Sequence, residues 1–306
     1  TTLSCALKGI RYPVVLGGGG VRIRRYSMSP EAFEERRQRI RELVLEKERA
    51  RLERKGLAEK IDRNLFRSPL TDDPEDESDD ILDNCYVREP KNHKYTLIWL
   101  HSIMEDNSKA RTMLQMISPE DVRVVVPNAP KIPITALDER DERAWWDIEF
   151  ENSQGNPEDE EDTIGIEESH KELIKLLELE EGIIGSENII LGGFGQGAAL
   201  ALYTALRYPV PLRGVMMWAG YVVGQENLPE DISDANFETK VLAYQGKADD
   251  IVNPTTALDG IKTLKSYGVP VEIRLVARMG HFVDQHQWVQ GYDWCMRNFH
   301  SGPKSS

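Results

Sequence analysis

The fold is decided by residues 189–200, which read IILGGFGQGAAL. An apolar run passes through glycines and continues into residues that favour a helix, so the stretch predicts a strand, a sharp turn and a helix. The frame G-x-S-x-G makes such a turn and holds a serine at its apex, above the edge of a sheet. Here the apex residue is Gly195, which has no side-chain atom that can attack a carbonyl group. The turn is therefore predicted without its nucleophile.

Short apolar segments alternate with helical segments on both sides of this turn. The other predicted strands cover residues 95–100, 122–126, 214–218, 241–244 and 271–276. The predicted helices include residues 110–114, 164–177, 198–207, 255–267 and 284–298, and residues 127–162 are rich in loops. This alternation predicts an α/β fold with a mostly parallel sheet and helices on both of its faces.

Composition divides the chain into five predicted parts. They are a basic, glycine-containing arm (1–28), a long charged helix (29–67), an acidic linker (68–92), the α/β domain (93–300) and a tail (301–306). With 306 residues and 40% hydrophobic content, the chain can bury one sizeable core and still carry these extensions.

The net charge of −14 and the isoelectric point near 5.0 argue against general affinity for nucleic acids or anionic lipids, because the field of the protein repels both. The three cysteines do not form the pattern of a disulfide framework, so we expect a reducing compartment inside the cell. We expect no transmembrane span, because no apolar run approaches ~18 residues.

The N-terminal segment differs from the rest of the chain. Up to Pro30 it contains five basic residues and no acidic one. This bias fits an organelle-targeting segment, and it fits an ordinary basic arm equally well. We expect a mitochondrial or other organelle matrix, with the cytoplasm as the alternative.

The charged helix begins with the capping sequence Ser29-Pro30-Glu31 and has only a narrow apolar stripe. Such a helix does not fold stably alone, and it is either solvated or laid along a partner. We favour the partner, and we therefore expect protein contacts through residues 1–67.

Two polar residues follow later strands in the order that a catalytic triad requires. Asp249 follows the strand at 241–244, and His281 follows the strand at 271–276. In a Ser-Asp-His arrangement the aspartate orients the histidine, and the histidine takes the proton of the nucleophile. Each residue alone has an ordinary structural explanation, but their order behind the elbow favours the triad layout.

Residues 94–299 resemble the acyl-protein thioesterase and carboxylesterase family of α/β hydrolases. The resemblance is carried by Leu100-His101, PNAP at 127–130, WWD at 145–147, LGGFGQG at 191–197, ALY at 201–203, ADD at 248–250 and Gly280-His281. It implies hydrolysis of esters or thioesters of acyl chains without a cofactor or a metal. It also implies catalytic positions at residues 195, 249 and 281, and oxyanion-hole positions at Ile103 and Gln196.

The chain departs from this family at two places. The family has serine where this chain has Gly195, and it has a glycine-rich oxyanion loop where this chain reads HSIME at 101–105. Glycines let the backbone turn its amides toward an oxyanion, and bulkier residues make that geometry harder to reach. Both departures point to lost catalysis.

The sequence therefore favours a pseudoenzyme that serves as a structural or interaction subunit of a larger assembly, with a mitochondrial assembly as the candidate. One alternative is an active ester or thioester hydrolase with a displaced nucleophile or an activated water. Ser102 is a less favoured substitute, because it lies in the oxyanion loop and not at the elbow. A second alternative is an acyl-chain binding protein whose pocket is formed by Trp145, Trp146 and Phe282.

Overall fold

The computed structural model describes residues 81–82, 84–116, 120–149 and 161–298. Seven strands form its main sheet in the order β1-β3-β2-β6-β7-β8-β9. Their bounds are β1 Cys85–Arg88, β2 Tyr95–Leu100, β3 Val122–Pro127, β6 Ile189–Phe194, β7 Gly214–Trp218, β8 Val241–Gly246 and β9 Val271–Val276. Every neighbouring pair is parallel except β1 with β3, which is antiparallel.

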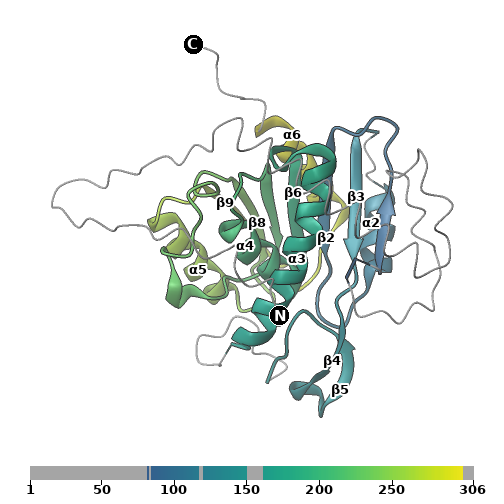
Figure 1. The fold of residues 1–306 in the computed structure, drawn as a ribbon. Helices are drawn as coiled ribbons and strands as arrows, with labels where there is room; N and C mark the ends of the chain where they lie inside the picture. The colour runs from purple at the N-terminus through teal and green to yellow at the C-terminus, as the bar shows by residue number, and fades with distance from the viewer. Residues whose placement is uncertain (1–80, 83, 117–119, 150–160, 299–306) are drawn as a thin grey trace, which may run out of the picture.

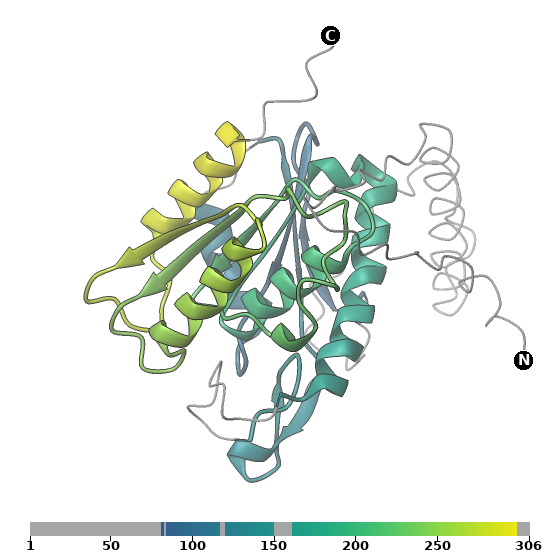
Figure 2. The same ribbon diagram turned by 90° about the vertical axis from the view of Figure 1, so that its left-hand side faces the viewer.

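Helices cover both faces of this sheet (Figures 1 and 2). Helices α3 (Thr163–Ile184), α4 (Gln196–Arg207) and α5 (Pro254–Ser266) pack on one face. Helices α2 (Asn107–Met116) and α6 (Gln285–Asn298) pack on the other, and Figure 2 shows α6 and α3 on opposite sides of the strands. The sheet is therefore the middle of three layers.

Strand β2 contributes apolar side chains to the core on both faces of the sheet. Its alternate residues Ile98 and Leu100 contact the α3–α4 side, whereas Leu97 and Trp99 contact the α2–α6 side. On the latter side the rings of Trp99 and Trp288 lie 3.9 Å apart between centroids. A strand buried on both faces needs an apolar run rather than an alternating one, which explains the composition of residues 95–100.

The carboxyl ends of the parallel strands share one edge of the sheet, and the loops that follow β2, β6, β8 and β9 begin there. The small antiparallel pair β4 (Lys131–Ile134) and β5 (Arg140–Arg143) follows β3 and projects from this edge, at the bottom of Figure 1. Ligands of open α/β sheets bind at such an edge. This geometry gathers residues that are far apart in the sequence.

The predicted strands and helices of the α/β domain are confirmed, with two differences. The predicted boundary after residue 92 lies too late, because β1 pairs with β3 and so belongs to the main sheet. The stretch 127–162 was predicted to be rich in loops but contains β4 and β5. Their sequences, KIPI with a central proline and RDER with charge at every position, gave only a weak strand signal.

The predicted arm at 1–28, the helix at 29–67 and the tail at 301–306 lie outside the described residues. Across the helices that the structure does describe, none combines the length and the apolar character needed to cross a bilayer.

Candidate active site

The turn between β6 and α4 has the elbow geometry that the sequence predicts. Gly195 has φ 56° and ψ −123°, a backbone conformation that residues with a side chain rarely adopt. Its amide donates to the Trp218 carbonyl at 2.9 Å, and its carbonyl accepts from the amides of Ala198 and Ala199. The apex is therefore fixed to both β7 and the first turn of α4.

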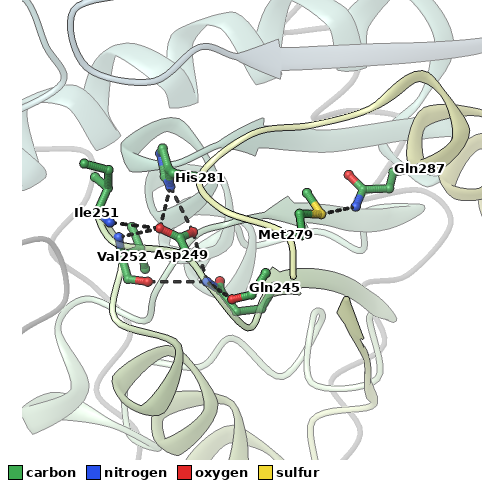
Figure 3. Close-up of polar contacts among 8 residues, drawn as sticks. Gln245, Asp249, Ile251, Val252, Met279, His281 and Gln287 are labelled. Atoms are coloured by element: carbon green, nitrogen blue, oxygen red, sulfur yellow. Dashed lines mark hydrogen bonds and ion pairs between the residues drawn. The ribbon is translucent and has the colours of Figure 1, made fainter. Parts of the chain in front are cut away.

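Asp249 and His281 meet at the same edge of the sheet. His281 Nδ1 lies 3.0 Å from Asp249 Oδ2 and 3.2 Å from Oδ1 (Figure 3). The carboxylate also accepts from the backbone amides of Ile251 and Val252 at 3.0 and 2.9 Å, and from Gln245 Nε2 at 3.1 Å. Because the Asp249 oxygens accept from Nδ1–H, the Nε2 atom of His281 keeps the lone pair that a general base needs.

The environment keeps Asp249 ionised. Burial raises the pKa of its carboxyl, but the hydrogen bond and charge of His281 and the two backbone amides outweigh this effect, so the pKa lies below its ordinary value. The Asp249 side chain is fully buried, whereas 13% of the His281 side chain is exposed. The Asp249 carboxylate is thus shielded from solvent, whereas the His281 ring that it orients is partly accessible.

His281 points at the elbow. A Cβ atom on Gly195 would lie 3.3 Å from His281 Nε2, so the base faces the place of an elbow side chain. The same Cβ atom would overlap Ser102 Oγ. The hydroxyl of Ser102 therefore occupies the space that Gly195 leaves open.

The loop after β2 keeps a turned backbone although it lacks glycines. Met104 adopts φ 61°, in the left-handed region where glycine is favoured, and its amide donates to the Arg143 carbonyl at 2.8 Å. This conformation costs about 1 kcal/mol or more for a residue with a side chain. Bulkier residues were expected to make this turn harder to reach, and the contact with β5 holds Met104 in it.

Two backbone amides remain available for an oxyanion. Within the described part of the chain, the N–H groups of Ile103 and Gln196 donate to no other group. The Gln196 amide is at the N-terminus of α4, where the helix dipole favours negative charge. The Ile103 side chain packs with Ile134 and Ala144, which fixes its backbone. Both residues were predicted at these positions.

Buried polar side chains support the loop from behind. His101 Nε2 accepts from the Ala129 amide at 2.9 Å, so Nδ1 carries the proton and donates to the Ser102 carbonyl at 2.7 Å. The side chain of Gln196 bridges the Trp145 amide and the Trp146 carbonyl at 2.9 and 2.8 Å. The loop after β2, the WWD segment and the elbow therefore form one hydrogen-bonded unit.

Comparison with known proteins agrees with this geometry. The phospholipase/carboxylesterase family matches residues 83–290. The chain belongs to this family. It is 37% identical to acyl-protein thioesterase 1 of Debaryomyces hansenii over 137 residues, which are 44% of this chain and 57% of that protein, so the match spans just over half of the relative.

Other relatives extend the match and differ in their described activity. The crystal structure of Zea mays acyl-protein thioesterase 2 superposes with a TM-score of 0.64 at 25% identity, covering 71% of this chain and 99% of that one. A protein of Oryza sativa subsp. japonica called a probable inactive carboxylesterase is 26% identical over 66% of this chain and 82% of its own length. The α/β-hydrolase fold is thus shared across the matched region.

The structure corrects the pocket that the sequence suggested. Trp145 and Trp146 are buried in the core and not placed along an open acyl pocket. Their roles are structural, because Trp145 Nε1 donates to the His101 carbonyl at 2.8 Å and Trp146 packs edge-to-face against Tyr221. Among the described residues, Phe282, next to His281, and Met104, on the oxyanion loop, are large apolar side chains that are exposed near the catalytic positions. Phe282 is 51% exposed.

Sequence reasoning underrated Ser102. It assigned this serine to the oxyanion loop and so to a place away from the elbow, but its Oγ lies in the space that a side chain on residue 195 would occupy. The available signal was the pair of substitutions itself: this chain has a serine in the glycine-rich loop and a glycine at the serine elbow.

The buried His101 makes the fold sensitive to acid. Burial lowers the pKa of His101 from 6.5 to about 4, against the opposing effect of its hydrogen bond to Ser102. In this pH range His101 is protonated in the unfolded chain and neutral in the folded chain. The free energy of unfolding therefore falls as the pH drops from 6.5 to about 4. We expect this residue alone to remove about 2 kcal/mol from the free energy of unfolding between about pH 7 and about pH 5.

Urea unfolding of the wild type and of His101→Gln at both pH values measures this contribution, because the other titrating groups are the same in both proteins. The variant is expected to lose less stability on acidification than the wild type. Equal losses in the two proteins would show that His101 is not the group responsible.

Proposed function

We propose that the protein hydrolyses carboxylic esters or thioesters without a cofactor, with His281 as the general base. The observation that carries this proposal is the position of His281, whose Nδ1 lies 3.0 Å from Asp249 and whose Nε2 faces the elbow apex. The named activities of the thioesterase relatives support the same substrate class. The amides of Ile103 and Gln196, which donate to no group among the described residues, supply donors for the oxyanion.

The two departures from the family, Gly195 at the elbow and the loop 101–105 without glycines, argue less strongly against catalysis once the geometry is known. The oxyanion loop still turns through Met104, and a hydroxyl is still present at the apex although it does not come from residue 195. The Asp249 carboxylate is held by Gln245 and by the Ile251 and Val252 amides, and in this position both of its oxygens contact His281 Nδ1, as a general base requires. These observations favour turnover.

A non-catalytic role is the second candidate, and Gly195 is the observation that favours it. In that case the domain is a pseudoenzyme that acts as an interaction subunit through residues 1–67, in a mitochondrial or other assembly, or that binds an acyl chain without turnover. The rice relative is named a probable inactive carboxylesterase, so a protein described as inactive already stands among the relatives of this chain.

Hydrolysis of a short-chain p-nitrophenyl ester and of an acetyl thioester separates these candidates. We expect turnover by the purified protein and a loss of about 10²–10⁴-fold in His281→Ala, because a general base contributes that much. His286→Ala is the matched control, since His286 is exposed on α6. A wild type that is no faster than His281→Ala would favour the pseudoenzyme.

A further inference from the structure

We infer that Ser102 supplies the attacking hydroxyl of this site, so that the reaction passes through an ester on Ser102. The inference rests on the proposed function, and it adds the identity of the nucleophile. Neither the loop position of Ser102 nor the family comparison assigns it this role. The geometry at the elbow does.

The first step is that Gly195 and Ser102 fit each other. A side chain on residue 195 would place its Cβ atom on Ser102 Oγ, so the serine hydroxyl can be at this place only because the apex residue is glycine. His281 Nε2 lies 3.3 Å from the same Cβ position. His281 Nε2 and the Ser102 hydroxyl therefore both lie next to the space of an elbow side chain, and they come from different loops.

The second step is that the backbone of Ser102 is fixed while its hydroxyl is free. Its carbonyl accepts from His101 Nδ1 at 2.7 Å, and its amide donates to Glu105 Oε2 at 3.3 Å. The residue is only 4% exposed, yet its Oγ has no hydrogen-bond partner among the described residues. A hydroxyl with no structural hydrogen bond can rotate about χ1 toward His281, and catalytic hydrogen bonds often form only when substrate is bound.

The third step is that the oxyanion donors suit a nucleophile at residue 102. In a nucleophile elbow, one donor is the amide of the residue that follows the nucleophile. The residue that follows Ser102 is Ile103, and the second donor, the Gln196 amide, comes from the elbow; in the part of the chain that the structure describes, neither amide has a partner. Moving the hydroxyl from one loop to the other therefore leaves the same two donors in use.

The reaction balances without any further component than water. Ser102 Oγ forms a bond to the acyl carbon and gives its proton to His281 Nε2, while the Ile103 and Gln196 amides hold the oxyanion. The bond to the leaving alcohol or thiol then breaks, and that group takes the proton from His281. Water next attacks the acyl-Ser102, again giving its proton to His281. Release of the carboxylic acid returns the proton to Ser102 Oγ.

The test compares the wild-type chain with Ser102→Ala and with Ser102→Cys. We expect hydrolysis of the p-nitrophenyl ester to fall about 10³-fold or more in Ser102→Ala, in line with removal of a nucleophile. In Ser102→Cys, incubation with the same ester is expected to add one acyl group to the mass of the intact protein, because the thiol is itself a nucleophile. Ser186→Ala, which removes another buried serine hydroxyl, is expected to match the wild type.

The outcomes separate this inference from the function on which it rests. Hydrolysis that depends on His281 but persists in Ser102→Ala would keep the proposed function and overturn the inference in favour of an activated water. An acyl adduct on residue 102 of the Cys variant, with no turnover by the wild type, would support the nucleophile's position and overturn the proposed function. Turnover and adduct both absent would overturn both. Far-UV circular dichroism of each variant checks that it is folded.

Discussion

Restoring serine at the elbow by Gly195→Ser alone is expected to destabilise the protein, and adding Ser102→Gly is expected to rescue about half of the loss. The new side chain has to adopt φ near 56°, which costs about 1–3 kcal/mol, and its Cβ atom overlaps Ser102 Oγ. Overpacking of this kind adds about 1–3 kcal/mol. Ser102→Gly removes the overlap but leaves the backbone strain.

Urea unfolding of the wild type, both single variants and the double variant measures the coupling between the two positions. We expect an interaction free energy of about 1–3 kcal/mol in favour of the double variant, because the two side chains compete for one space. Strictly additive effects would show that Ser102 Oγ does not occupy the elbow space in solution. The single variant Ser102→Gly serves as the control for lost loop stiffness.

Replacing Asp249 with asparagine is expected to lower kcat for ester hydrolysis about 10³–10⁴-fold. An asparagine amide group facing His281 Nδ1 would donate to it, and the proton would then reside on Nε2, where it blocks the acceptance of a proton from the nucleophile. The side-chain oxygen of Asp249→Asn can still accept from the Ile251 and Val252 amides, so the loop is expected to persist.

Asp250→Asn is the matched control, because Asp250 is adjacent and exposed. Its kcat is expected to equal that of the wild type. If Asp249→Asn hydrolysed the ester as fast as Asp250→Asn does, the buried carboxylate would have no part in orienting the base.

Most of the fold follows from local patterns in the sequence. The apolar run at 189–194 and the glycines after it predict β6 and its turn, because a strand buried on both faces needs apolar residues at every position. Asp249 and His281 could be placed together because the carboxyl ends of parallel strands share an edge. By contrast, β1 follows a charged segment and has only half-buried residues, so nothing local distinguished it from the acidic linker.

The part of the site that could not be predicted depends on packing between loops. No residue-level preference indicates that Met104 adopts a left-handed conformation, since the Arg143 carbonyl in β5 holds it there. The approach of Ser102 to Gly195 is likewise a contact between two loops that are far apart in the sequence. The burial of Trp145 and Trp146 was equally hidden, because an aromatic pair beside a catalytic motif can line a pocket or fill the core.

Peptide mapping after treatment with a fluorophosphonate probe tests the central claim most directly, because the probe bonds covalently to an activated serine hydroxyl. If Ser102 is the nucleophile, the probe is expected to add one phosphonyl group to Ser102, and to add it more slowly in Asp249→Asn and His281→Ala. A folded protein that takes up no phosphonyl group at Ser102 under conditions that label an active thioesterase would contradict it.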